Sequence, residues 1–384
     1  MTPRERLLTT LKGGIADRVP LMLPGFDFRT HAAIDAHPDL LRREVAHRVF
    51  DGVTYRVQVE SYVNRYLVTP PQCIRPETKS LPNGFSETHG VIDTPKGDLT
   101  FTTQYDPLSG TTWTLEYPVK TLDDVEKIAS VVWELPEDLA QPSLDDLALP
   151  DDFDRRGILA TSISSPFVCV AGMMRFEQFL EWALTERSLM LELTEVCRQR
   201  ILDVLAVLFA KPGIEYVWIG GSEWVTPPMA SPREYDAFVQ EQERSLIEYA
   251  HAQALSPLVL PGGGEMSPVV HVHCHGHVRH ALVRSIERGA DYTEPVEPPP
   301  DGDITMAEAK ALADGRITLG GNIECRVLCN EDEDAVEAAV RAAFEGGKHR
   351  FVLRPTEGPS PRMTEREFRN WMRVVDVWED LSPI

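Results

Sequence analysis

Short apolar segments alternate with longer amphipathic segments from about residue 155 to the end of the chain. Short runs rich in β-branched residues are typical of buried strands, and longer runs with helical spacing are typical of amphipathic helices. This alternation predicts a parallel sheet, because a helical crossover normally joins two parallel strands. The predicted strands are 157–163, 214–219, 269–273, 290–293, 316–319 and 349–353.

The first part of the chain adds a helix and two strands. Thr2, Pro3 and Glu5 form the signature of a capped helix start. Segment 17–25 is interpreted as a loop that enters a buried strand, and 53–59 as a second strand. Together with the later six, these strands predict a (β/α)₈ TIM barrel with an N-terminal helical extension, although a doubly wound sheet also fits the pattern.

A different pattern interrupts this alternation. Residues from about 85 to 118 form short segments rich in Thr, aromatic and β-branched side chains, which predicts inserted antiparallel hairpins. The acidic, Pro-containing segment 135–154 is interpreted as a connector. We therefore expect one barrel domain over residues 1–384 that carries a hairpin insertion.

Charge narrows the range of expected partners. A formal net charge of -22 repels nucleic acid and anionic membrane surfaces, so neither is expected as a partner. The chain has no apolar run of membrane-spanning length, and its N-terminus lacks the apolar core of a signal peptide, so we expect a cytoplasmic protein. The six scattered cysteines do not suggest a disulfide framework. None of these features excludes a homo-oligomer.

Five of the eleven histidines lie within residues 271–280. On a strand, side chains alternate between faces, so His271, His273 and His275 are expected on one face and Cys274 on the other. Two imidazoles in this arrangement can converge on a metal ion, and Gly276 permits a sharp turn after them. The alternatives are a solvated strand end and a core strand with one satisfied histidine. The clustering favours a metal or catalytic role.

In a (β/α)₈ barrel the chemistry takes place at the C-terminal ends of the strands. The predicted strand ends carry polar or glycine-rich segments, which form a candidate inventory for the site: 164–166, 220–224, the histidine cluster, Glu294, 320–325 and 354–357.

Several of these segments, in their order along the chain, resemble the uroporphyrinogen decarboxylase superfamily. The resemblance extends over nearly the whole chain and implies a (β/α)₈ barrel. The segments that carry it are 2–6, 17–20, Ser164-Ser165-Pro166-Phe167, His273-Cys274-His275-Gly276 and Gly320-Gly321-Asn322-Ile323.

The superfamily has a decarboxylase branch and a methyltransferase branch. The decarboxylases bind tetrapyrrole carboxylates through arginines in a Gln-Ala-Gly-Arg-type motif after the first strand, and they use no metal. The equivalent segment here, 23–29, lacks that motif and offers only Arg29. Because a polycarboxylate requires a strongly cationic pocket, the sequence resembles the methyltransferase branch more closely.

The methyltransferase branch works with zinc and with corrinoid proteins. Its metal motif is His-x-Cys-Gly at one strand end and Gly-Cys at the last strand. On this chain the histidine falls on His273, the first cysteine on His275, and the last cysteine near Glu357. Both thiolates are thus replaced, and such a nitrogen and oxygen set suits Zn²⁺ but equally Fe²⁺, Mn²⁺ or Co²⁺.

The corrinoid itself is expected on a partner protein, because the Asp-x-His-x-x-Gly motif of corrinoid-carrying domains is absent from this chain. The resemblance then predicts a metal-dependent methyltransferase or demethylase that moves methyl from a small O- or N-methyl compound to a corrinoid, or the reverse. A decarboxylase similar to uroporphyrinogen decarboxylase is the alternative, and a non-catalytic ligand-binding barrel is a third.

Strand-end position suggests roles for the remaining residues, each with a structural alternative. Glu223 is interpreted as a catalytic base or a helix cap, and Glu357 as a metal ligand or a solvated loop carboxylate. Glu324 is a second catalytic candidate, which with Arg326 alternatively forms a structural ion pair. The predicted substrate contacts are Trp224, Asn322, Arg326 and His277.

Overall fold

A curled parallel sheet of seven strands forms the centre of the computed structural model, which describes residues 1–139, 147–210, 213–253 and 266–384. Its strands lie in the order β1-β6-β7-β8-β9-β10-β11, and each pairs in parallel with its neighbours. Their bounds are β1 Tyr55–Val59, β6 Gly157–Ser164, β7 Tyr216–Gly220, β8 Val269–His273, β9 Tyr292–Glu294, β10 Thr318–Ile323 and β11 Phe351–Pro355.

The eighth strand position is occupied by an extended segment around Leu21. Leu21 forms a parallel bridge with Leu353, supported by hydrogen bonds from Met22 N to Leu353 O at 3.0 Å and from Leu353 N to Pro20 O at 3.0 Å. Pro20 and Pro24 lack a backbone donor, so they cannot extend this pairing into a full strand. The predicted TIM-barrel-like fold is confirmed, and in the described residues no ladder joins this segment to β1.

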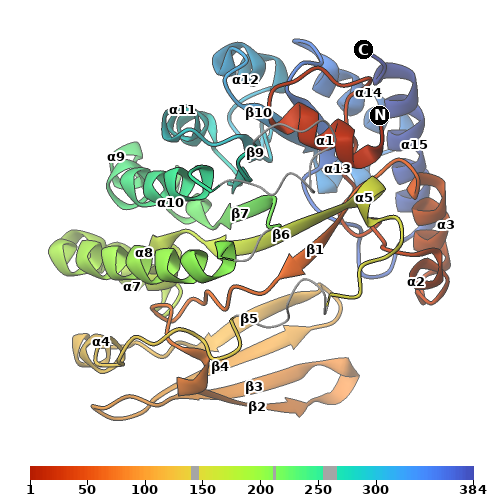
Figure 1. Cartoon of the computed structure of the whole chain (residues 1–384). Helices are drawn as coiled ribbons and strands as arrows, with labels where there is room; N and C mark the ends of the chain where they lie inside the picture. Colours follow the sequence, from red (N-terminus) through yellow and green to blue (C-terminus); the bar gives the residue numbers. More distant parts are fainter. Residues whose placement is uncertain (140–146, 211–212, 254–265) are drawn as a thin grey trace.

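Helices after the barrel strands cover the outer face of the sheet (Figure 1). Aliphatic and aromatic side chains of strands and helices meet there in a continuous core. The bounds are α2 His31–Asp35, α3 Leu40–Val49, α5 Phe153–Arg156, α6 Pro166–Ala171, α7 Phe176–Thr185, α8 Arg187–Phe209, η4 Ser222–Val225, α9 Pro232–Tyr235, the π-helical turn η5 Asp236–Gln240, α10 Glu241–His251, α11 Arg279–Arg288, α12 Met306–Ala313, α13 Cys325–Asn330, α14 Glu333–Phe344 and α15 Glu365–Leu381.

The predicted N-terminal helix is α1, Pro3–Leu11. Thr2 caps it and forms the expected capping box with Glu5. Its leucines pack against residues at the N-terminal ends of the barrel strands, among them Ile158, Tyr216 and Val269. The helix therefore covers the end of the barrel opposite to the one where the histidine cluster lies.

The insertion is a four-stranded antiparallel sheet, which lies as a separate layer beside the barrel (Figure 1). It begins before the predicted boundary of about 85, because six of the seven residues of its first strand are exposed and give no alternating pattern. Its elements are η1 Pro71–Cys73, β2 Ile74–Ser80, η2 Pro82–Gly84, β3 Ser86–Ile92, β4 Leu99–Asp106, β5 Thr111–Glu116 and the following α4 Leu122–Ala129.

Part of the predicted connector at 135–154 cannot be compared with the fold, since residues 140–146 lie outside the described residues. Its last residues enter α5 instead of remaining irregular. Among the described helices, none combines the length and the apolar character that crossing a membrane requires.

Candidate functional site

Strand β8 has the predicted alternation. The His271 ring contacts Tyr216 of β7 and Tyr292 of β9, at centroid distances of 5.6 and 4.5 Å, inside the barrel. Cys274 is buried on the opposite side, close to Ser222, and burial raises the pKa of its thiol. The histidines and the cysteine therefore occupy different environments.

Glu294 at the end of β9 joins the inner histidines. Its Oε1 lies 2.9 Å from Nε2 of His271, 2.8 Å from Nδ1 of His273 and 2.7 Å from Nη1 of Arg354. Burial alone would raise the pKa of this carboxyl, but the charges of Arg354 and His273 hold that pKa well below its usual range. Glu294 is consequently an ionised carboxylate inside the barrel.

His271 is neutral in this environment. Burial lowers its pKa to about 4, although Glu294 favours the charged form. Its Nδ1 lies 2.6 Å from the Tyr216 hydroxyl. This geometry fits an imidazole that carries its proton on Nε2, toward Glu294, and accepts from tyrosine at Nδ1.

Towards the strand end, His275 repeats the arrangement of His273. Its Nδ1 lies 3.0 Å from Oε1 of Glu297, whose other carboxylate oxygen accepts from the backbone N–H of Gly276. Gly276 has a φ of +82°, a left-handed conformation that glycine adopts without strain. The rings of His273 and His275 are 4.6 Å apart and nearly perpendicular.

Both outer histidines thus direct Nδ1 toward a carboxylate, and this leaves Nε2 of each for a ligand. Pairing of one ring nitrogen with a carboxylate is the usual way in which a protein orients a metal-binding histidine. The predicted third residue, Glu357, is close, since its Oε1 lies 3.4 Å from Nε2 of His275 and its side chain is 64% exposed. Of the three predicted metal residues, His273 therefore contacts His275, and His275 contacts Glu357, at the barrel mouth.

A second donor set overlaps with this one. Ligand atoms of His271, His273 and Glu294 all lie within 4.8 Å of one another. However, the same oxygen of Glu294 is bound by Arg354, and a fixed guanidinium charge opposes a cation at that position. Among the described residues, only this inner set brings three donor atoms so close together. The outer set is more open, but no described arginine or lysine contacts Glu297 or Glu357, so the charge of its carboxylates suits a divalent cation.

Glu324 and Arg326 form an ion pair, which was the predicted alternative to a catalytic role of Glu324. Arg326 lies 2.7 Å from Oε2 of Glu324 and 2.6 Å from Oδ2 of Asp301. Burial and a hydrogen bond with Asp301 raise the pKa of Glu324 to about 7. Its Oε1 is buried without a hydrogen-bond partner among the described residues. Glu324 is thus a carboxyl that can hold or release a proton near neutral pH.

The other predicted residues lie around this cluster rather than in it. Asn322 is buried in β10, where it pairs in register with Arg354. The Trp224 ring instead packs on Phe176, at a centroid distance of 5.7 Å. His277 forms no hydrogen bond with a described residue.

Glu223 belongs to the outer side of the sheet. It lies close enough to Cys274 and Glu243 to raise the pKa of both groups, although burial is the larger cause for each. One of its carboxylate oxygens is buried without a partner in the described part of the chain. Within that part, no hydrogen bond or ion pair joins Glu223 to His273 or His275, so a direct role at the metal residues has no support in this geometry.

Sequence reasoning assigns no role to Glu297. It identifies Glu294 and Arg354 only as strand-end residues, and His271 only as a member of the histidine cluster. A usable signal exists for His271, which shares the strand face of His273. Glu297 follows β9 in a Pro-rich loop, and only the fold shows that it reaches His275.

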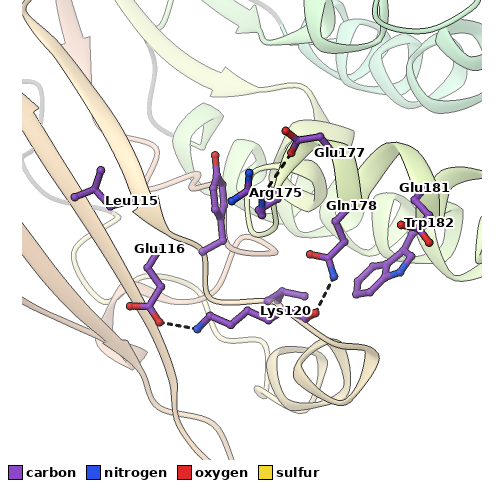
Figure 2. Close-up of a pocket in the computed structure, with 10 residues that line it drawn as sticks. Leu115, Glu116, Lys120, Arg175, Glu177, Gln178, Glu181 and Trp182 are labelled. Carbon is purple, nitrogen blue, oxygen red and sulfur yellow. Dashed lines mark hydrogen bonds and ion pairs between the residues drawn. The ribbon is translucent and has the colours of Figure 1, made fainter.

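A separate concavity of about 530 Å³ lies between β5 and α7 (Figure 2). Its two basic side chains have acidic neighbours: Lys120 Nζ is 2.7 Å from Glu116, and Arg175 is 3.7 Å from Glu177. The Lys120 carbonyl also accepts from Gln178 at 2.9 Å. Since these charges are already paired, we place no chemistry there.

Comparison with known proteins identifies the family and the fold. A family profile described as "Uroporphyrinogen decarboxylase (URO-D)" matches residues 102–378. A methyltransferase from Methanosarcina mazei shares the fold with a TM-score of 0.58 and 16% identity, over 99% of both chains. No curated protein matches the sequence.

Two B12-independent methionine synthases superpose less well. The protein from Shewanella sp. W3-18-1 has a TM-score of 0.39 and 8% identity, over 76% of this chain and 74% of its own. The putative enzyme from Listeria monocytogenes has a TM-score of 0.31 and 15% identity, over 58% of this chain and 64% of its own.

Proposed function

Because this chain belongs to the uroporphyrinogen decarboxylase family, we propose that it is a metal-dependent methyltransferase or demethylase. It would move a methyl group between a small O- or N-methyl compound and a corrinoid carried by a partner protein. The observation that supports this proposal is that His273 and His275 each direct Nδ1 toward a carboxylate, while Nε2 of His275 faces Glu357, the third predicted ligand.

Two imidazole nitrogens and a carboxylate oxygen suit Zn²⁺ with an open coordination position, and also Fe²⁺, Mn²⁺ or Co²⁺. His273, His275 and Glu357 would hold the ion. When bound, the ion would supply Lewis acidity to the oxygen or nitrogen of the methyl donor. Glu294 and Glu297 contact the two rings at Nδ1, and such contacts restrict the rotation of metal-binding histidines.

Glu324 supplies the proton in this proposal. Its raised pKa of about 7 allows it to protonate a departing oxygen or nitrogen at neutral pH. Asn322, Arg326, Trp224 and His277 stay as proposed substrate contacts. Glu223 stays as a proposed catalytic residue that would act without contact to His273 or His275.

Charge at the barrel mouth disfavours the decarboxylase alternative. Glu297 and Glu357 lie near His275, Glu297 also lies near Glu324, and the buried Arg354 is bound by Glu294. A substrate with many carboxylates would meet like charges there without a free arginine cluster. The remaining alternative is a non-catalytic barrel. An activity assay distinguishes it from a methyltransferase.

The assay follows the absorbance of cob(I)alamin as acceptor, with methanol, trimethylamine and a methoxylated benzoate as donors. Methylcobalamin should form with at least one donor in the wild type and in Cys274→Ser, whose side chain lies on the other face of β8. It should not form in His275→Ala. Conversion unaffected by His275→Ala, or none with any donor, would contradict the proposal.

The pH profile tests the role of Glu324. The rate should fall as pH rises through about 7, because Glu324 then loses the proton that it donates. Glu324→Gln should be slower and should lose this alkaline decline. A variant that retains both the rate and the decline would exclude Glu324 as the acid.

A further inference from the structure

A basic loop lies at the end of the barrel opposite to the histidine cluster. Residues Gly346–Arg350 join α14 to the start of β11, beside the loop that leads from α12 to β10. A cavity of about 170 Å³ opens between these loops. Its lining contains several basic residues, a pair of adjacent glycines and a short apolar wall: Lys310, Ala313, Gly315, Ile317, Leu319, Gly346, Gly347, Lys348, His349 and Arg350.

Lys348, His349 and Arg350 at this cavity form no ion pair with a carboxylate among the described residues. Lys348 Nζ donates to the Pro383 carbonyl at 2.6 Å, and Arg350 Nη1 donates to the Arg316 carbonyl at 3.4 Å. His349 Nε2 is 3.2 Å from the carbonyl of Gly13. Because Lys348 and Arg350 each use one N–H in these bonds, most of their donors stay available.

Arg316 lies between the lining residues Gly315 and Ile317 and adds a further cation beside the cavity. Its Nε and Nη2 donate to the carbonyls of Ala313 and Leu312, each at 3.2 Å, and it forms no ion pair within the described ranges. Lys310 differs, since its Nζ already donates to three backbone carbonyls, those of Ala343, Glu345 and Gly347. Lys310 therefore supports the loop and is not counted as a ligand contact.

The backbone of the lining loop also has donors without an acceptor among the described residues. Gly346 and Gly347 have φ values of +77° and +109°, and a Cβ at Gly347 would meet nothing within 4 Å. The N–H of Gly346 and that of Lys348 donate to no described residue. Free amides in a glycine turn beside lysine and arginine are the groups that proteins use to bind phosphate.

From these observations we propose that this loop binds a phosphate group, either as inorganic phosphate or as a phosphomonoester. A chain of net charge -22 would otherwise gain electrostatic stability by placing carboxylates next to Lys348, Arg350 and Arg316. The site is independent of the proposed methyl transfer, because it lies at the N-terminal ends of β10 and β11.

Titration calorimetry of the full chain at low ionic strength tests this site, with inorganic phosphate in one arm and adenosine 5′-monophosphate in the other. Saturable binding should appear in at least one arm and weaken with added NaCl. Lys348→Ala and Arg316→Ala should each weaken it about tenfold, as expected for the loss of one charged contact. Binding of adenosine 5′-monophosphate alone would identify a phosphomonoester, rather than inorganic phosphate, as the ligand.

Two control variants separate binding at the loop from binding elsewhere on the molecule. Arg362→Ala removes an equal charge from an exposed arginine and should bind phosphate as the wild type does. His275→Ala should also retain binding, which excludes phosphate held at a metal. Absence of binding in both arms, or equal losses in Arg362→Ala and Lys348→Ala, would overturn the proposal. Circular dichroism confirms that each variant is folded.

Discussion

Three histidines with the same side-chain direction on and just after β8 have different protonation environments. His271 is buried and neutral, while burial is outweighed at His275 by Glu297, so that the pKa of His275 is raised. The sequence predicts the common face of these residues, because alternation depends on the backbone alone. It does not predict Glu294 and Glu297 as partners, since these come from the next strand end and its loop.

The buried His271 should make stability depend on pH. Its pKa is about 4 in the fold and 6.5 when unperturbed, so the unfolded chain binds the proton first as pH falls. The free energy of unfolding should therefore decrease by about 1.6 kcal/mol between pH 6.5 and 5, because the slope rises from half of about 1.36 kcal/mol per unit towards its full value. Urea unfolding in chelator at both pH values measures this.

His271→Gln should lose that pH dependence, whereas the exposed His47→Gln should keep it. An equal pH dependence in His271→Gln and the wild type would show that another group causes it.

At the scale of elements, β8 was predicted with its observed bounds, because its apolar and histidine residues alternate clearly. Strand β10 extends further than its predicted end at 319 and includes Gly320 and Gly321. Glycines weaken the hydrophobic pattern that identifies a strand, yet β10 requires a glycine at position 320. A Cβ at Gly320 would lie 2.1 Å from the Tyr292 hydroxyl and 2.7 Å from Cβ of Glu294.

Gly320→Ala should consequently displace β9 at the candidate site. We expect a loss of about 1–3 kcal/mol in the free energy of unfolding, which is typical of overpacking in a core. Gly52→Ala is the control, because its Cβ would meet only ordinary contacts, the nearest at 3.5 Å. A loss in Gly320→Ala no larger than in Gly52→Ala would contradict the close packing of β10 against β9.

At the scale of the whole molecule, the alternating pattern predicts the barrel but not its irregular eighth position or the first strand of the insertion. Both depend on residues without a hydrophobic period: prolines beside Leu21, and the exposed β2. The start of helix α1 could be predicted from its capping residues. Its packing could not, because the residues that it contacts are distant in the sequence. That packing includes a buried ion pair between Arg4 and Glu215.

Arg4→Met should destabilise the barrel through Glu215, whose side chain is 1% exposed. Removal of one partner leaves a buried charge without compensation, which typically costs about 3–5 kcal/mol. Arg48→Ala, which removes an exposed ion pair with Glu379, should cost about 1 kcal/mol or less. Urea midpoints compare the two variants, and similar losses would show that α1 is not held by this pair.

The metal content of the purified protein decides whether the outer histidines form a metal site. Elemental mass spectrometry should find about one divalent transition metal per chain in the wild type, in Cys274→Ser and in His271→Gln, as expected for a single site with three protein ligands. The metal should be absent from His273→Ala and from His275→Ala. A wild type without metal, or full metal content in both variants of the outer pair, would contradict the proposed site. Loss in His271→Gln with retention in His275→Ala would place the metal at the inner set with Glu294 instead.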